Sequence, residues 1–286
     1  KLLTPPAREG HKQVTIISSL ESALLSLGRM DIIACQDTAL HRMDPRSKIV
    51  TTIAFLAAVV SFGKYEISQM VPFILYPVYL LSAGNIPAGY ILKKVLYVSP
   101  FALMIGIFNP LLDHRMFLLP GGHEVSAGWI SLVSIMLRFS LTVTTALALI
   151  ACTGFYNVCY ALHKLGAPRV FVVQLLFIYR YLFVLMEEGA RMVRARSLRS
   201  FEGQGGGLTV YGSLVGHLLL RTVNRAQRIY NAMVCRGFDG NVRIMRDAGF
   251  TSRDFIFILA WCGIFMILRS VNVAQLAGIL VTRMFS

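Results

Sequence analysis

The chain has 286 residues, of which 56% are apolar and 15% are charged, and its mean hydropathy is +0.63. A soluble domain is about 45–50% apolar and about 25% charged, so this composition excludes a soluble protein. Several long apolar runs predict an all-α integral membrane protein. Half of the net charge of +14 lies in residues 180–253, which contain twelve arginines and no lysine against five acidic residues. Such a set favours either forked pairing with carboxylates or a polybasic surface that faces anionic lipid.

The chain before the first apolar run is amphipathic. Residues 14–41 have a helical apolar period with polar breaks, so we expect residues 1–45 to form a cytoplasmic or interfacial segment. In the sequence HRMDPRSKIV, Asp44 suits a helix N-cap and Pro45 suits the first helical position. The basic side chains of Arg46 and Lys48 follow at once. By the positive-inside rule they place this helix start on the cytoplasmic side of the membrane.

Five apolar runs predict about five transmembrane helices. The first four, which we assign to residues 46–153, are residues 49–62, 67–83, 95–112 and 125–152. A turn-rich loop at residues 113–124 separates the third run from the fourth. Because four spans return a chain to its starting side, the following arginine-rich segment is also predicted to be cytoplasmic. The fifth run, assigned to residues 252–286, begins at Phe255 and is interrupted by Arg269.

Residues 154–251 are predicted to form a cytoplasmic domain of two long, amphipathic, basic helices. The first begins apolar near residue 162 and ends charged near residue 200, before the break GQGGG at 203–207. The second covers about residues 210–235 and stops at Gly237. Each helix has one charged stripe, formed by Arg180, Glu187, Arg191 and Arg194 in the first and by His217, Arg221, Arg225 and Arg228 in the second. The opposite face of the second helix carries Leu219, Val223, Ala226, Tyr230 and Met233.

No pattern of catalytic or metal-binding residues stands out. There is no G-x-x-x-x-G-K-[ST] sequence, so the chain has no Walker A loop for a nucleotide. The six histidines do not cluster at ligand spacing, and we expect His114 and His123, which share one loop, to be solvated rather than metal ligands. Arg138 and Arg269 interrupt apolar runs and are either functional residues or arginines that reach the membrane interface. We therefore expect a protein that is not an enzyme and that binds no metal or cofactor itself.

Three motifs occur in an order that is similar to a known family. Residues 44–48 are Asp-Pro-Arg-Ser-Lys, and the two basic helices end in Ala195-Arg196-Ser197 and Cys235-Arg236-Gly237. Over roughly residues 35–270 the chain resembles the transmembrane T component of energy-coupling factor (ECF) transporters, and most of all its cobalt-type CbiQ branch. Further matching positions are Pro168, Arg180, Tyr181 and Glu188 in the first helix and Arg225, Ala226, Met233 and Phe238 in the second. Cys235 departs from the family, which has alanine at this position.

The resemblance implies a non-catalytic coupling subunit of an ATP-driven importer. Its two motifs, Ala195-Arg196-Ser197 and Cys235-Arg236-Gly237, would dock into two copies of an ABC ATPase, which use ATP and Mg²⁺. A small substrate-binding membrane subunit, the CbiM-like S component, would be the other partner, and no nucleic acid is involved. The substrate expected first is cobalt, with nickel or a biotin-type vitamin as alternatives. The chain would be a multi-pass protein of a bacterial cytoplasmic membrane with its N-terminus in the cytoplasm. The supporting residues of the coupling helices would be Arg180, Glu188, Arg191, Arg194, Arg221, Arg225 and Arg228.

Physical reasoning supports this role for the two motifs and also keeps rivals open. An arginine near a helix C-terminus is stabilised by the helix dipole, and small neighbours allow its guanidinium to enter a groove. The rivals are a surface that holds lipid headgroups, a secondary transporter or channel, and an enzyme that acts on lipid headgroups. A secondary transporter or channel would need polar residues paired at the membrane midplane, and an enzyme would need clustered catalytic groups. The sequence shows neither clearly. Reversing the charge of Arg196 or Arg236 should abolish uptake, whereas reversing that of Arg221 should do much less.

Overall fold

The computed structural model describes residues 28, 31, 33–63, 65–112, 116–118, 124–199, 208–240 and 249–270. The chain divides into two compact units. The bundle unit contains residues 31–161 and 246–286, and the two-helix unit contains residues 162–245 together with 1–30. Three expected features lie wholly or largely outside the described residues, namely the amphipathic N-terminal segment, the Gly-rich break at 203–207 and the apolar run beyond residue 270.

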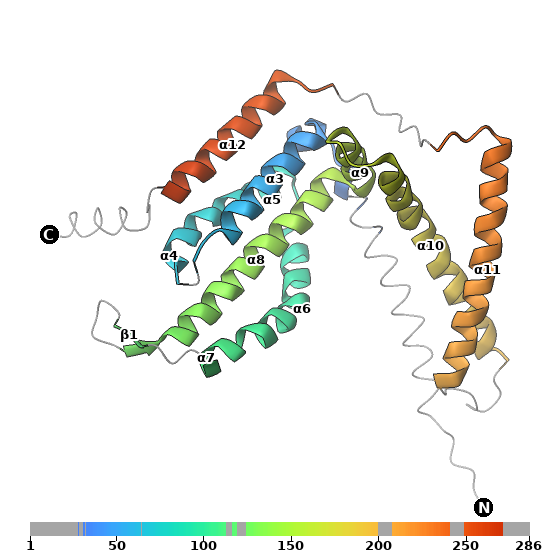
Figure 1. Cartoon of the computed structure of the whole chain (residues 1–286), viewed down its shortest axis with the longest axis horizontal. Helices are drawn as coiled ribbons and strands as arrows, with labels where there is room; N and C mark the ends of the chain where they lie inside the picture. The colour runs from blue at the N-terminus through green and yellow to red at the C-terminus, as the bar shows by residue number, and fades with distance from the viewer. Residues whose placement is uncertain are drawn as a thin grey trace, which may run out of the picture. The chain divides into compact units, whose positions relative to one another are not determined.

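The bundle unit is built around one long helix. Its elements in chain order are α2 (Ala39–Arg42), α3 (Pro45–Val60), α4 (Ile67–Met70), the 3₁₀ helix η1 (Val71–Ile74), α5 (Leu75–Ala83), α6 (Ala88–Gly106), α7 (Phe108–Leu112), β1 (Met116–Leu118), β2 (Glu124–Ser126), α8 (Ala127–Thr153), α9 (Phe155–Lys164) and α12 (Ser252–Ser270). Helices α3, α5, α6 and α7 all pack on α8, and α12 packs on α3 (Figure 1). Helix α8 is therefore the centre of this unit.

The four apolar runs expected before residue 153 are largely helical, which confirms the all-α class. The run at 67–83 is not one regular helix, because Pro72 lacks a backbone N–H and lies in the 3₁₀ turn that separates α4 from α5. The loop expected at 113–124 contains part of a small antiparallel pair, in which Met116 lies opposite Ser126. The described part of the chain is otherwise helix, turn and loop.

Three described helical segments are long and apolar enough to cross a membrane. They are Ala88–Pro110, Gly128–Thr153 and Arg169–Arg196, and Ile67–Ala83 is a shorter apolar segment. Helix α3 has only 16 residues, and the 19-residue α12 carries three charged residues, so neither reaches this length and composition. The segment Arg169–Arg196 lies in the region expected to be cytoplasmic. The number of five spans and this assignment stay predictions.

An aromatic cluster holds α3, η1, α5 and α12 together. Phe55 and Tyr76 are 0% and 1% exposed, and their ring centroids are 4.9 Å apart. Phe265 of α12 lies 5.2 Å from Tyr76 and 5.5 Å from Phe55, with its ring edge-on to both. The Tyr76 hydroxyl is hydrogen-bonded to Thr52 at 3.0 Å, so its polar end is satisfied inside the apolar core.

Helix α6 instead presents apolar side chains outward. Leu96, Tyr97 and Phe101 are 70%, 88% and 67% exposed. An apolar surface of this kind is costly in water and ordinary in hydrocarbon. The exposed face of α6 therefore fits contact with lipid or with another membrane subunit.

The bundle unit brings its chain back to the side on which it started. The buried Lys48, in the first turn of α3, donates from Nζ to the carbonyl oxygen of Cys152, near the end of α8, at 3.4 Å. The start of α3 and the end of α8 are therefore neighbours. This is the arrangement that an even number of crossings between them requires.

The two-helix unit contains two long helices that run in opposite directions. They are α10 (Arg169–Ser197) and α11 (Leu208–Cys235). Near one end of the pair, the Phe177 ring of α10 lies 6.5 Å from the ring of Phe238, just after α11. Towards the other end, Glu188 of α10 bonds to Arg221 of α11 at 2.9 Å. Figure 1 shows the two helices side by side.

Candidate functional site

The two small-Arg-small motifs end the two long helices. Ala195-Arg196-Ser197 forms the last residues of α10, and Cys235 is the last residue of α11, followed by Arg236 and Gly237. Because the helices are antiparallel, the motifs lie at opposite ends of the pair. About 20 residues of α11 lie between the level of Arg196 and the level of Arg236, which corresponds to about 30 Å of helix. The structure thus presents two similar arginine tips on one helical support.

A C-terminal cap determines the end of α11. Gly237 has φ +78°, which is unfavourable for residues with a Cβ. Its N–H donates to Val234 O at 2.9 Å, and the Phe238 N–H donates to Met233 O at 3.0 Å. These two bonds form a Schellman motif, which satisfies carbonyl groups at the helix end. Gly237, expected as a helix stop, therefore has a geometric role beside Arg236.

The end of α10 is closed without glycine. The Leu198 N–H donates to Arg194 O at 3.2 Å, and the Arg199 N–H donates to Arg196 O at 2.9 Å. Ala195 is exposed and Arg196 is half-buried, whereas Cys235 and Arg236 are both exposed. The two arginine tips therefore share sequence and position, but they differ in their cap and in their exposure.

A glutamate joins the two helices between the motifs. Glu188 Oε1 accepts a bond from Arg221 Nη1 of α11, and its Oε2 accepts one from Arg191 Nη2 of α10, both at 2.9 Å. Glu188 is 23% exposed, whereas the two arginines are 65% and 62% exposed. Arg221 was expected to be a simple stripe residue, but it is the α11 partner of this bridge. It is therefore not a neutral control for charge reversal.

The remaining stripe residues stay at the surface, and the packing face of α11 is a different one. Arg180, Arg194, Arg225 and Arg228 are exposed. On the face named from the sequence, Leu219 and Tyr230 are 61% and 62% exposed. The half-buried positions of α11 are Leu214, Leu218, Thr222, Ile229 and Met233. The half-buried positions differ from the expected apolar face because a third face of α11, between the charged and the apolar stripes, is turned toward α10.

The predicted helix start at Asp44 and Pro45 is present in the bundle unit. Asp44 is the N-cap of α3, with Oδ1 accepting from the Arg46 N–H at 2.8 Å, and Pro45 is the first helical residue. The Arg46 guanidinium lies 5.9 Å from the centre of the Tyr160 ring of α9. This motif therefore acts locally, as a helix cap and as a contact to α9.

Sequence reasoning missed Asp254, which links the starts of two helices. Its side chain is buried, Oδ1 accepts from the Asp44 N–H and Oδ2 from the Thr251 N–H, both at 2.9 Å. One carboxylate thus serves both the start of α12 and the residue that caps α3. A threonine three residues before an acidic residue resembles a capping box, and this signal could have indicated the bond between Thr251 and Asp254. No local pattern indicates the bond between Asp44 and Asp254, because these residues are 210 positions apart.

Arg138 and Arg269, left open from the sequence, both bind the end of α3. Arg138 Nη2 donates to Phe62 O at 2.9 Å, and Arg269 Nη2 donates to Ser61 O at 3.1 Å. Arg269 also approaches Glu66 Oε2 at 3.5 Å. Carbonyl groups at a helix end lack intrahelical partners and favour a positive charge. Both arginines are therefore explained as caps of α3.

The described residues contain no group of three His, Cys, Asp or Glu side chains that would hold a metal ion. His114 and His123 lie outside them.

Comparison with known proteins agrees with the motifs. The CbiQ family, described as cobalt transport protein, matches residues 36–245. An uncharacterized protein of Methanocaldococcus jannaschii is 27% identical over 230 residues, which cover 77% of this chain and 78% of the relative. The energy-coupling factor transporter transmembrane protein EcfT of Heliobacterium modesticaldum is 27% identical over 257 residues, covering 81% and 92%. A Methanocorpusculum labreanum protein, named as a fused cobalt transport protein CbiMQ, is 29% identical over 112 residues, covering 39% and 17%. The chain therefore belongs to the CbiQ family, the transmembrane T components of energy-coupling factor transporters.

Proposed function

We propose that this chain couples two copies of an ABC ATPase to a separate substrate-binding membrane subunit, for the uptake of cobalt. ATP and Mg²⁺ are used by the ATPases, and this chain is not itself an enzyme. The observation that supports the proposal is the position of Arg196 and Arg236 at opposite ends of one antiparallel helix pair. Two such tips give each ATPase copy one attachment point on a shared support.

The physical step is the transfer of movement. Arg196 lies in the last turn of α10 and Arg236 directly follows α11. At both places the helix dipole favours a positive charge, and each guanidinium can bind a carboxylate or backbone carbonyls of a partner. When two ATPases approach one another, the two tips are displaced together. The bridge between Glu188 and Arg221 resists sliding of α10 past α11, so the displacement passes to the membrane helices.

The substrate and the second partner rest on the relatives. The matching family is described as cobalt transport protein, and one relative is named as a fusion, CbiMQ. A fusion of this kind favours a CbiM-like subunit as the partner that binds the substrate. Nickel and a biotin-type vitamin stay as alternative substrates. We also propose a bacterial cytoplasmic membrane with the N-terminus inside, because Arg46 and Lys48 lie at the start of α3.

Charge reversal tests this function. Arg196→Glu and Arg236→Glu are each introduced into the complete transporter, and uptake of radioactive cobalt into vesicles and co-purification of the ATPases are measured. Each single variant should lower uptake by at least about 100-fold. In the docked state the new glutamate would face the partner groups that bind the arginine, so repulsion would replace a buried favourable contact. Arg180→Glu, an exposed arginine of α10 outside both motifs, should do much less.

Two outcomes would decide against the proposal. Normal uptake in the double variant Arg196→Glu/Arg236→Glu would show that the tips do not dock. Equal losses in Arg180→Glu and Arg236→Glu would instead favour the rival function, a diffuse basic surface that binds anionic lipid.

A further inference from the structure

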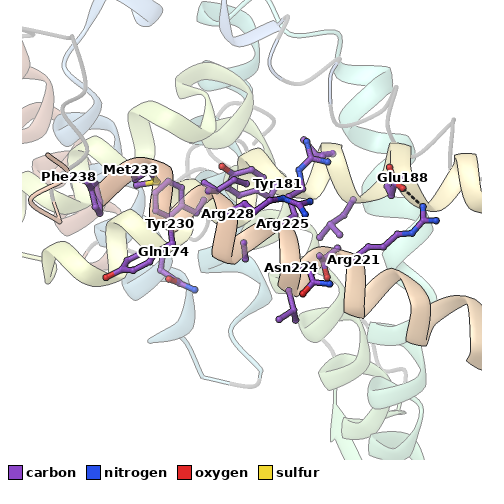
Figure 2. Close-up of a pocket in the computed structure, with 17 residues that line it drawn as sticks. Gln174, Tyr181, Glu188, Arg221, Asn224, Arg225, Arg228, Tyr230, Met233 and Phe238 are labelled. Atoms are coloured by element: carbon purple, nitrogen blue, oxygen red, sulfur yellow. Dashed lines mark hydrogen bonds and ion pairs between the residues drawn. The ribbon is translucent and has the colours of Figure 1, made fainter. Parts of the chain in front are cut away.

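Two stretches of chain connect the helix pair α10 and α11 with the bundle unit. Inside the pair, Glu188 bonds to Arg221 across the two helices at 2.9 Å, as Figure 2 shows. The entry stretch leads from α8 through α9, and residues 165–168 separate α9 from α10. The exit stretch leads from Arg236 to α12, which begins at Ser252. A displacement of the pair that passes along the chain therefore reaches the bundle unit at α8 and α9 or at the start of α12.

The exit stretch is held on the first turn of α3. Asp254, in the first turn of α12, is 3% exposed, and its Oδ1 accepts from the Asp44 N–H at 2.9 Å. The hydroxyl of Ser47 lies 3.5 Å from the same oxygen. Asp254 Oδ2 accepts from the Thr251 N–H at 2.9 Å, just before α12. Bonds from N–H groups to a carboxylate are roughly twice as strong as bonds between neutral groups, so this is a firm attachment.

The entry stretch is held on the same turn of α3. The buried Lys48 donates from Nζ to the carbonyl oxygen of Cys152, near the end of α8, at 3.4 Å. The Arg46 guanidinium lies 5.9 Å from the centre of the Tyr160 ring in α9, at the outer limit of a cation–π contact. Both stretches are thus bound to residues 44–48, which we call the α3 junction.

The opposite end of α3 is also joined to α12, but it does not lead to α10 or α11. There, Arg269 Nη2 donates to Ser61 O at 3.1 Å. From Ser61 the chain continues into α4, and Arg269 is the second-last residue of α12. The same two helices are therefore held together at both ends, and only the end at the α3 junction adjoins the stretches that lead to the helix pair.

We propose that the α3 junction and Asp254 pass the movement of α10 and α11 to the bundle unit, as positioning residues. This role rests on the coupling function proposed above and adds the place where the movement enters the membrane helices. When the arginine tips are displaced, the start of α12 and the end of α8 are pulled together, and both pull on the first turn of α3. Hydrogen bonds between rigid helices form the kind of contiguous contact along which such coupling passes. The Asp-Pro-Arg-Ser-Lys motif thereby has a role beyond capping α3.

The test uses the complete transporter in vesicles. Cobalt uptake, ATP hydrolysis, co-purification of the ATPases and the thermal midpoint are measured for each variant. Lys48→Met removes the amine and keeps the buried place filled, and Asp254→Asn keeps one acceptor oxygen. Each should lower the cobalt taken up per ATP hydrolysed by between about twofold and about 30-fold. Binding of the ATPases and ATP hydrolysis should stay normal, because neither residue belongs to the arginine tips.

The matched control is Arg269→Met, which weakens the contact between α3 and α12 at the other end. It should lower the thermal midpoint and leave the cobalt taken up per ATP hydrolysed unchanged. A merely structural role of Asp254 would instead give the same relation between thermal midpoint and coupling in Asp254→Asn and in Arg269→Met.

Three results would overturn the proposal. Equal losses of coupling in Arg269→Met and Asp254→Asn would mean that general weakening of the bundle unit is the cause. Normal coupling in the double variant Lys48→Met/Asp254→Asn, with the ATPases bound, would remove the role of the α3 junction and leave the coupling function intact. Absence of the ATPases from the wild-type preparation would overturn the coupling function itself, and the role of the junction with it.

Discussion

At the scale of single residues, the buried Asp254 accepts hydrogen bonds from two backbone N–H groups. Replacement by alanine leaves the N–H groups of Asp44 and Thr251 without their acceptor in a buried place. We expect Asp254→Ala to lower the free energy of unfolding by about 3 kcal/mol. Thermal unfolding in detergent measures this change. Asp254→Asn keeps one acceptor oxygen and should lose clearly less.

The control for Asp254 is an exposed carboxylate. Asp37 pairs with Arg42 at 2.7 Å, but the two side chains are 73% and 72% exposed. Water solvates such an exposed pair almost equally in the folded and the unfolded chain. Asp37→Ala should therefore leave the unfolding temperature unchanged. Equal effects of the two substitutions would contradict the role given to Asp254.

His41 makes the bundle unit sensitive to acid. Burial lowers the pKa of this imidazole, and the positive charge of Lys48 lowers it further. The unfolded chain then binds the proton more readily, so stability should fall as the pH decreases below about 6.5. His41→Gln should flatten the dependence of the unfolding temperature between about pH 7.5 and about pH 5.5. An unchanged slope in this variant would remove His41 as the cause.

At the scale of elements, the end of α11 depends on its cap. Gly237→Ala forces a Cβ into a backbone with φ +78°, which costs about 1 kcal/mol. The two Schellman hydrogen bonds should weaken, so the backbone N–H groups of the new alanine and of Phe238 should exchange faster with deuterium. Cobalt uptake should fall as well, because Arg236 loses its fixed position.

Gly212 provides the matched control within α11. It is exposed, and a Cβ there would meet no atom within 4 Å. Alanine is the better residue inside a helix by about 0.5–1 kcal/mol, so Gly212→Ala should stabilise α11 slightly and leave uptake unchanged. Faster exchange at Phe238 in both variants would contradict the cap.

Helices were well predicted because their signals are local. The apolar runs, the N-cap Asp44, the first-turn Pro45 and the stop at Gly237 each depend on neighbouring residues, and all four features are present. The face of α11 that packs on α10 was not predicted. An amphipathic helix in a membrane protein has several environments around it, so apolarity alone does not select the packed face.

At the scale of the whole molecule, the coupling proposed above requires α10 and α11 to move together. Arg221 and Arg191 bond to the same carboxylate at 2.9 Å and are similarly exposed, but only Arg221 belongs to the other helix. We expect Arg221→Ala to lower the cobalt taken up per ATP hydrolysed by up to about fivefold, since an exposed pair contributes modestly. Uptake and ATP hydrolysis are measured together in vesicles.

The Arg191→Ala variant should keep normal coupling, because it removes only a bond within α10. Glu188→Gln should reproduce the effect of Arg221→Ala. Equal losses in the Arg221 and Arg191 variants would mean that total charge matters and that the bridge between the helices does not.

The sequence by itself determined the class of protein, the order of the apolar runs and the two arginine motifs. These depend on composition and on residues close together along the chain. Only the tertiary structure decided that Asp254 serves Asp44, that Arg138 and Arg269 cap α3, and that Arg221 alone of its stripe pairs with Glu188. Each of these contacts joins residues 33 or more positions apart. Many carboxylates, carbonyls and arginines are chemically able to pair, and only packing brings particular ones within hydrogen-bond distance.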